Sequence, residues 1–220
     1  MTQFIAPSGS NLNIAEAIHL HGSLHFQTFI SALQQTQAEA ETLRTRIIQT
    51  HEGLVYEILP DAGASCPVID CREANNPDNA ALLWMQTRLR APLDLAKDEL
   101  WQNALLRVGE THWIWFHCCH HAVLDGFAGG LIAARVATLY TARLKDVEAP
   151  CSAFLPLATL HEQEKAYRAS ERYLLDKAYW LEQLRDAPEP VSLSLRPHRP
   201  PSGDHGGAIT RSKMMVGARA

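Results

Sequence analysis

Apolar and polar residues alternate along several short stretches of the chain, which is the pattern of half-buried β-strands. In residues 11–22, leucines and isoleucines stand between polar partners until Gly22 ends the run. The same kind of pattern predicts further strands over residues 43–49, 54–59, 68–71, 104–108, 112–119 and 208–216. Two pairs of these strands are separated only by short turns, at Glu52-Gly53 and at Gly109-Glu110, and we expect each pair to form a hairpin.

Helical spacing replaces the alternation in four other stretches. Phe26, Phe29, Ile30 and Leu33 recur every three to four positions, so residues 24–38 are expected to form an amphipathic helix. Similar spacing predicts helices over residues 77–90, 127–144 and 157–184, the last as one long helix. Residues 187–207 are rich in Pro and Gly and are expected to form a linker.

Composition narrows the class of protein. Of the 220 residues, 46% are hydrophobic, which is enough for a sizeable core, and the net charge of −4 gives no basic patch for nucleic acid or an anionic membrane. Charged residues interrupt the apolar runs, so no transmembrane segment is predicted, and residues 1–10 do not resemble a signal peptide. Five cysteines, an odd number, do not suggest a disulfide framework, and we expect a cytoplasmic protein.

The segment His120–Gly126 interrupts the regular pattern between a buried strand and a helix. Such a strand-to-helix turn places reactive side chains at the edge of a sheet, where binding and catalytic residues are common. A general base there needs one ring nitrogen unprotonated, which His121 can supply, and Asp125 can hold the loop in shape. Gly126 can take φ values that a residue with a Cβ would resist.

The sequence of this segment, HHAVLDG, resembles the HHxxxDG signature of nonribosomal peptide synthetase condensation domains and of their chloramphenicol-acetyltransferase-like relatives. Other segments resemble the same family in the same order, namely residues 13–24, 41–46, 92–107 and 179–184. The resemblance covers about residues 11–216 and is closest to condensation domains of enterobactin-type siderophore synthetases.

The resemblance implies an α/β fold, the chloramphenicol-acetyltransferase-like open-faced sandwich, with a mixed sheet and helices mainly on one face. It assigns residues 11–186 to the N-terminal lobe of a condensation domain, 187–207 to a linker, and 208–220 to a truncated strand and tail. The Gln-rich helix that opens the family's domain and the second lobe that completes it have no counterpart here. We therefore expect a single lobe, that is, an incomplete domain.

The resemblance also implies roles for individual residues. His121 would be the general base or positioning group, and His120 would turn away from the channel and form hydrogen bonds inside the lobe. Asp125 would shape the loop through an ion pair, with Arg44 as the first candidate partner and Arg135 as the alternative, although it could also cap the following helix. Gly126 would meet a backbone requirement. The expected substrate channel consists of Ala128, Gly129 and Gly130, where the glycines either admit a pantetheine arm or serve packing.

The implied reaction is amide-bond formation between carrier-bound acyl and aminoacyl thioesters. The chain itself would bind no cofactor, because phosphopantetheine belongs to the partner carrier domains. The expected partners are acyl or peptidyl carrier proteins and a complementary C-terminal lobe or adenylation module. Two alternatives stay open: a stand-alone CoA-dependent acyltransferase of the chloramphenicol-acetyltransferase type, which would form a trimer, and a non-catalytic remnant or binding module. Whether the single lobe is an active enzyme also stays open.

The histidines and cysteines of residues 117–121 raise the alternative of a metal site. Adjacent residues of a strand point to opposite faces, so Cys118 and Cys119 cannot easily bind one ion. The other cysteines are scattered, and no second Cys or His pair has zinc-finger spacing. We therefore expect buried thiols and no metal.

Overall fold

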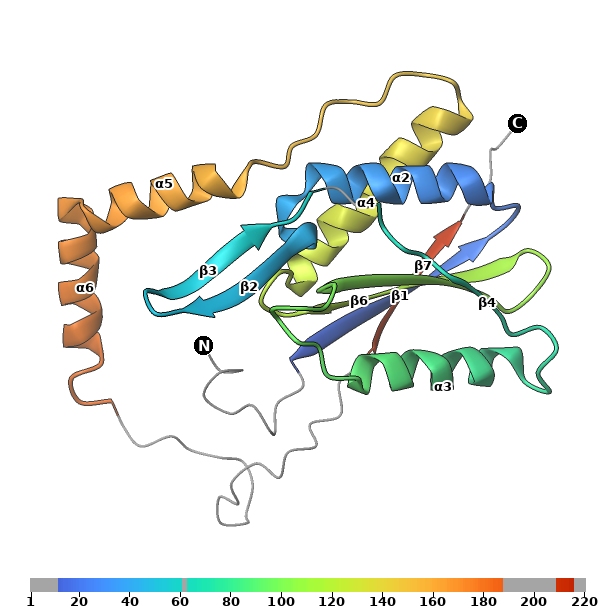
Figure 1. Cartoon of the computed structure of the whole chain (residues 1–220), viewed down its shortest axis with the longest axis horizontal. Coiled ribbons are helices and arrows are strands. Elements are labelled where there is room, and N and C mark those ends of the chain that lie inside the picture. Colours follow the sequence, from blue (N-terminus) through green and yellow to red (C-terminus); the bar gives the residue numbers. More distant parts are fainter. Residues whose placement is uncertain (1–11, 61–62, 188–208, 216–220) are drawn as a thin grey trace, which may run out of the picture. The chain divides into compact units, whose positions relative to one another are not determined.

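The computed structural model describes residues 12–60, 63–187 and 209–215 (Figure 1). Its contacts divide the chain into two compact units, residues 1–154 with 203–220, and residues 155–202. The first unit contains the predicted strand-to-helix turn, and the second contains two helices. No helix among the described residues is both long and apolar enough to span a lipid bilayer.

A five-stranded mixed sheet is the centre of the first unit. Its strands, in spatial order, are β4 (Val68–Asp70), β5 (Trp101–Arg107), β6 (His112–His120), β1 (Asn13–His21) and β7 (Ile209–Met215). The central strand β6 runs antiparallel to both neighbours, whereas β4 and β7 run parallel to the strands they join. A separate hairpin consists of β2 (Thr45–Thr50) and β3 (Gly53–Ile58).

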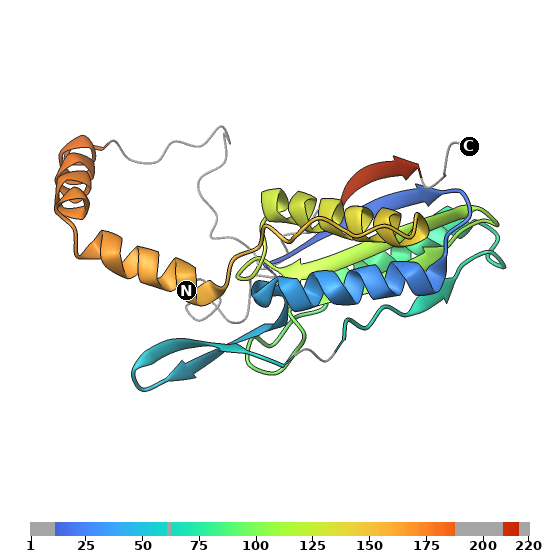
Figure 2. The same cartoon turned by 90° about the horizontal axis from the view of Figure 1, so that it is seen from above.

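Helices cover both faces of this sheet. The helices α2 (Phe26–Glu39) and α4 (Gly126–Leu144) pack beside each other on one face (Figure 2), and α3 (Pro77–Arg90) lies on the other (Figure 1). A 3₁₀ turn over Glu41–Arg44 leads from α2 to β2. The predicted mixed sheet with helices mainly on one face is confirmed, and α3 covers the opposite face.

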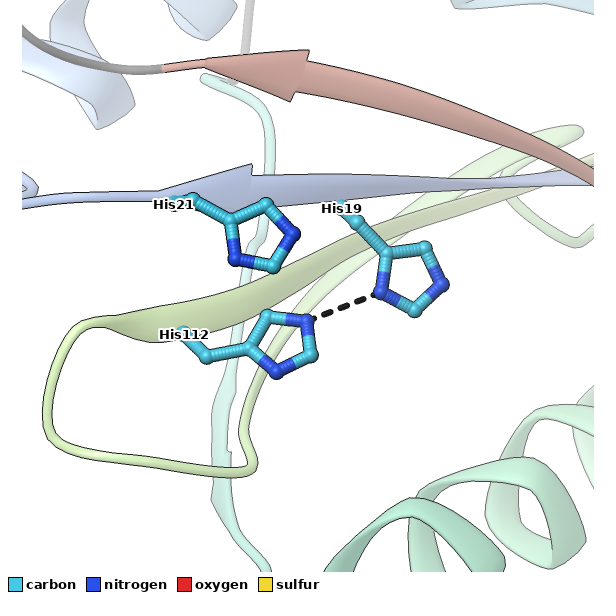
Figure 3. Close-up of side chains that lie close together, drawn as sticks. All are labelled: His19, His21 and His112. Atoms are coloured by element: carbon cyan, nitrogen blue, oxygen red, sulfur yellow. Dashed lines mark hydrogen bonds between the residues drawn. The ribbon is translucent and has the colours of Figure 1, made fainter.

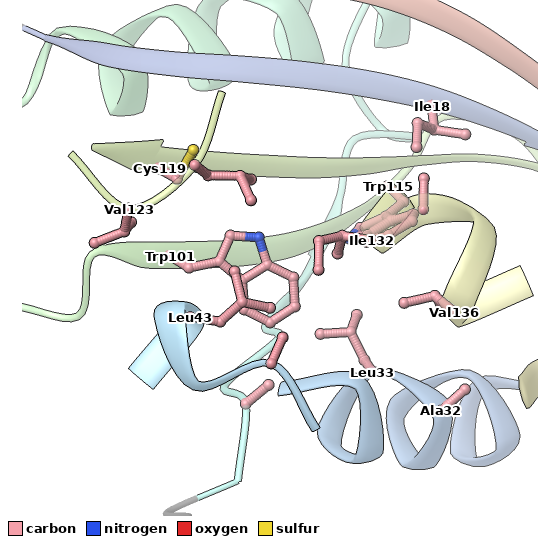
Figure 4. Close-up of a cluster of buried hydrophobic side chains, with 14 of the residues drawn as sticks. Ile18, Ala32, Leu33, Leu43, Trp101, Trp115, Cys119, Val123, Ile132 and Val136 are labelled. Carbon is pink, nitrogen blue, oxygen red and sulfur yellow. The ribbon is translucent and has the colours of Figure 1, made fainter. Parts of the chain in front are cut away.

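The strand alternation divides the buried side chains of the sheet between two cores. On the α2/α4 face, Trp101 and Trp115 pack against residues such as Leu33 and Val136 (Figure 4). On the α3 face, Phe116, which follows Trp115 in β6, packs with Met85 and Leu89 of α3. Because β6 contributes large side chains to both cores, its position is fixed from two sides, and so is the turn that follows it.

The prediction of one long helix over residues 157–184 is wrong. The second unit has two helices, α5 (Leu157–Arg168) and α6 (Glu171–Gln183). Ser170 separates them, since its hydroxyl accepts a hydrogen bond from the backbone N–H of Tyr173 and donates one to the carbonyl of Tyr167. An N-cap serine thus begins a new helix inside an uninterrupted apolar pattern. Apart from Ala187, the predicted linker lies outside the described residues.

Candidate active site

The HHAVLDG segment connects the end of β6 to the start of α4. The backbone N–H of His121 donates to the carbonyl of Leu12, 2.9 Å away, and so continues the β1–β6 pairing by one residue. The N–H of Val123 donates to the carbonyl of His120 and closes the turn. Val123 and Leu124 are buried, and Val123 packs in the core beneath the turn (Figure 4). The loop is therefore held by backbone hydrogen bonds and by buried apolar side chains.

The two histidines of the segment have opposite environments. His120 is 2% exposed, and its Nδ1 accepts a hydrogen bond from the N–H of Ala122 at 3.1 Å. Burial lowers the pKa of His120, and the neighbouring His121 lowers it further. With Nδ1 as the acceptor, the proton of the neutral ring is assigned to Nε2. His121, in contrast, is exposed.

A cavity of about 240 Å³ opens beside His121. Its walls come from two parts of the fold. The turn and α4 contribute His121, Leu124, Asp125, Gly126, Gly129 and Gly130, and the sheet contributes Ile14, Ala15, Glu16, His117 and Cys119. The structure thus places an exposed imidazole at a cavity that polar and apolar side chains line together. Such a mixture is typical of small-molecule sites.

Asp125 is the N-cap of α4. Its Oδ1 accepts a hydrogen bond of 2.7 Å from the N–H of Ala128, and its carbonyl accepts one from the N–H of Gly129. The expected ion pair with Arg44 or Arg135 is not formed. The cap turns the Asp125 carboxylate toward the backbone of its own helix, where it satisfies an N–H that has no intrahelical partner.

Both arginines have partners elsewhere in the first unit. Arg44 donates to the carbonyl of Leu59 and lies 4.0 Å from the carboxylate of Glu41. Arg135 makes two hydrogen bonds of 2.7 Å to the carboxylate of Glu39 and so joins α4 to α2. Arg44 thus supports the β2–β3 hairpin, and both its hydrogen bond and its ion pair are to residues outside the HHAVLDG turn.

The expected backbone requirement at Gly126 is wrong. Its φ lies outside the left-handed region, and a Cβ built there would have no atom within 4 Å. The backbone at Gly126 therefore does not require a glycine, and the missing side chain leaves space at the cavity. A Cβ on Gly129 would lie 3.8 Å from Cε1 of His117 and 3.9 Å from Oε2 of Glu16, which is ordinary contact. Ala128 packs against the core and is not part of the cavity lining.

Glu16 and His117 are site residues that the sequence patterns did not reveal. They lie opposite each other on β1 and β6, with Oε2 of Glu16 3.3 Å from Nε2 of His117, and both line the cavity. Nδ1 of His117 is buried and has no hydrogen-bond partner in the described part of the chain. The sequence did carry a signal for this pair. A carboxylate and an imidazole on the buried faces of two predicted strands are unusual unless the two side chains are paired.

The adjacent cysteines point to opposite sides of β6. Cys119 lies in the core under α2 and α4, and Cys118 lies in the core under α3. Burial raises the pKa of each thiol to about 12. Neither is therefore a thiolate at neutral pH, the form that binds metals and acts as a nucleophile.

Comparison with known proteins adds independent information. The sequence model of the family described as Condensation domain matches residues 1–213. The chain is 36% identical over 197 residues to a dimodular nonribosomal peptide synthase of Bacillus subtilis (strain 168), a match that covers 90% of this chain and 8% of that protein. It is 32% identical over 200 residues to enterobactin synthase component F of Escherichia coli O157:H7, covering 90% of this chain and 15% of that protein.

Solved structures of condensation domains also match the chain. The starter condensation domain of rhizomide synthetase RzmA matches with a TM-score of 0.79 and 32% identity, over 86% of this chain and 46% of that chain. The first condensation domain of the calcium-dependent antibiotic synthetase, in complex with a substrate analogue, matches with a TM-score of 0.77 and 31% identity, over 87% of this chain and 46% of that chain. The chain thus spans less than half of these domains. The family predicted from the HHAVLDG segment is confirmed: the chain belongs to the condensation domain family of nonribosomal peptide synthetases.

Proposed function

We propose that this chain contributes the catalytic histidine to amide-bond formation between two carrier-bound thioesters. The observation that supports the proposal most strongly is the pair of environments in the HHAVLDG turn. His120 is buried and held by the loop, whereas His121 is exposed at the cavity. Asp125 contributes by capping α4. Gly126 and Gly130 leave space for the substrate at the cavity wall, because a Cβ on either would meet no atom within 4 Å.

In the proposed step, the nitrogen of the aminoacyl group attacks the carbonyl carbon of the acyl thioester. The imidazole of His121 accepts a proton from the amine as the C–N bond forms. The C–S bond then breaks, and the leaving thiolate of the donor carrier takes the proton that the imidazole accepted, so that the products are an amide and a thiol and His121 is neutral again. His121 acts as the general base, or it holds the amine in place by a hydrogen bond. Tethering of both substrates supplies much of the rate, because the encounter is no longer bimolecular.

The proposal extends to the partners. The substrates are phosphopantetheine thioesters on acyl or peptidyl carrier domains, and we propose no cofactor bound by the chain itself. Residues 11–186 act as one lobe, and a complementary lobe or adenylation module on a longer product or a second chain completes the channel. Siderophore-type or other peptide synthesis in the cytoplasm is the setting we propose. The similarity to synthetases that are many times longer than this chain supports these assignments.

A single-turnover assay tests the role of His121. The lobe is joined to a complementary lobe in a complete synthetase, and amide formation is measured between an acyl carrier and an aminoacyl carrier. We expect His121→Ala to lower the rate by about 10²–10⁴-fold, the usual contribution of general acid–base catalysis. The matched control is His51→Ala, because the His51 side chain is 91% exposed in the β2–β3 turn. If His121→Ala keeps the turnover of the control, the proposal is wrong.

A further inference from the structure

Three histidines form a cluster at the opposite end of the β1–β6 pair from His121. His19 and His21 are in β1 and His112 is in β6, and their side chains converge on the same side of the sheet (Figure 3). Nδ1 of His19 lies 2.9 Å from Nε2 of His112, and the rings of His21 and His112 stack with centroids 4.3 Å apart. One ring nitrogen from each histidine lies within 4.8 Å of the others.

The backbone holds these histidines in place. His21 and His112 are directly opposite in the β1–β6 register, and His19 is two residues away on the same face of β1. The strand ends are tied together by the N–H of Gly22, which donates to the carbonyl of Thr111 at 2.8 Å, and Gly22 has a φ of +119° that permits the chain to turn there. Sites built on paired strands are more precise than sites on loops.

Two further hydrogen bonds fix His112. The N–H groups of Val108 and Gly109 both donate to its carbonyl, each at 3.1 Å. His112 is therefore anchored by the β5–β6 turn as well as by its pairing with β1. All three histidine side chains are half-buried, so they are partly ordered by packing and still reachable from solvent.

We propose that His19, His21 and His112 form a binding site for one divalent transition-metal ion, with Zn²⁺ as the ion of first choice. Three imidazoles and one water are a common four-coordinate set for zinc, and imidazole ligands select first-row transition metals over Mg²⁺ and Ca²⁺. Zn–N bonds of about 2.0–2.1 Å in a tetrahedron place ligand nitrogens about 3.3–3.4 Å apart. To bind one ion, the ring nitrogens of His19 and His112, which are 2.9 Å apart, separate by about half an ångström. Because all the ligand nitrogens lie within 4.8 Å of one another, no pair has to approach by more than about 1.5 Å.

This site is separate from the cavity at His121. The histidine cluster is on the α3 face of the sheet, because His19 and His21 share their side of β1 with Ala15 and Ala17. The cavity is on the α2/α4 face, where Cys119 is buried. His112 and His121 are nine residues apart, which is about 30 Å along a strand. A bound ion therefore takes no part in the acyl transfer and instead joins the ends of β1 and β6.

A rival explanation is that the rings are simply stacked, with one neutral imidazole donating to another. The two explanations differ in what happens when metal is added. A stacked cluster binds no ion stoichiometrically, whereas three converging imidazoles bind one equivalent and stabilise the fold by mass action. The expectation of no metal rests on the strand geometry of residues 117–121 and on the scattered cysteines, and neither argument applies to His19, His21 and His112.

Isothermal titration calorimetry with ZnCl₂ tests the proposal on the full chain, purified without a polyhistidine tag. We expect one Zn²⁺ per chain, a higher Tm with Zn²⁺, and no response to MgCl₂. His21→Ala and His112→Asn should each weaken binding at least tenfold, whereas His51→Ala, in the exposed β2–β3 turn, should leave it unchanged. Circular dichroism of each variant shows whether it is folded.

Titration of the unmodified chain with Co²⁺ keeps the test decisive if a variant does not fold. A tetrahedral nitrogen site gives strong visible d–d bands without the near-ultraviolet charge-transfer band of a thiolate ligand. Absence of saturable binding in the unmodified chain overturns the proposal. So does a thiolate band, or binding that survives His21→Ala and is lost in His121→Ala, because either result places the ion elsewhere.

Discussion

Glu16 and His117 face each other across β1 and β6, with Oε2 of Glu16 3.3 Å from Nε2 of His117, in the cavity that His121 also lines. The His117 side chain is only 4% exposed and that of Glu16 is 20% exposed. Nδ1 of His117 has no hydrogen-bond partner among the described residues. Within that part of the chain, the buried ring therefore depends on the carboxylate of Glu16 for its hydrogen bond.

We predict that Glu16→Ala lowers the free energy of unfolding by about 1–3 kcal/mol, the cost of a buried polar group that loses its partner. Glu16→Gln should lower the free energy of unfolding much less, because the glutamine amide can still form a hydrogen bond with Nε2 of His117. Urea denaturation measures both. In a double-mutant cycle with His117→Phe, the cost of Glu16→Ala should shrink, since no polar ring then remains to be satisfied. Equal costs in both backgrounds would contradict the pairing.

Asp125 allows a test that separates a helix cap from an ion pair. We predict that Asp125→Ala lowers the free energy of unfolding by about 1 kcal/mol, the usual value for loss of an N-cap. Asp125→Asn should retain nearly all of the stability, because asparagine also accepts from the N–H of Ala128. An ion pair would be lost equally in both variants. Thermal or urea denaturation distinguishes these results, and a large loss in Asp125→Asn would support the ion pair.

We predict that a glycine at position 126 is not needed for folding but is needed for activity, because it leaves space at the cavity. Gly126→Ala should change the free energy of unfolding by less than about 0.5 kcal/mol, because surface substitutions without strain have small effects. Gly53→Ala is the matched comparison: it also meets no atom within 4 Å, but its φ of +125° should cost at least about 1 kcal/mol. If Gly126→Ala destabilises the chain as much as Gly53→Ala, the turn does need a glycine. In the complete synthetase, we expect Gly126→Ala to slow acyl transfer.

The local elements could be predicted from the sequence because their signals are local. The alternation around Trp115 gives β6, and the polar residues from His120 to Gly126 give the turn before α4. The break at Ser170 was missed for an equally local reason. Tyr167 and Leu174 continue the apolar period across the break, so only the capping serine marks the change of direction.

The site was only partly predictable, because its remaining parts depend on strand register. Glu16 and His117 are 101 positions apart in sequence, and His21 and His112 meet only through the same pairing of β1 with β6. Hydrophobic alternation assigns each residue a face but not an opposite partner. The backbone angle at Gly126 was not predictable either, because a glycine permits a left-handed φ without requiring one.

His120 gives the chain a stability that depends on pH. Burial lowers its pKa in the folded state, so between the folded value and the usual value of about 6.5 the unfolded chain binds more protons than the folded one. The contribution of His120 to the free energy of unfolding therefore rises with pH through this window, and it is lost as the pH falls through the window. Protonation also removes the acceptor on Nδ1 that the N–H of Ala122 uses. The slope from this one group is at most about 1.4 kcal/mol per pH unit.

His120→Asn isolates this contribution, because an asparagine oxygen can accept from the N–H of Ala122 without titrating. We predict that the variant is less stable than the unmodified chain at pH 7.5, because the imidazole packs in the lobe, and that the difference narrows as the pH falls to 5. Urea denaturation at constant ionic strength measures both chains at each pH. Since all other titrating groups are common to the two proteins, their effects cancel in the difference. A difference that stays constant from pH 7.5 to 5 would mean that His120 titrates alike in the folded and unfolded chains, contrary to its buried position.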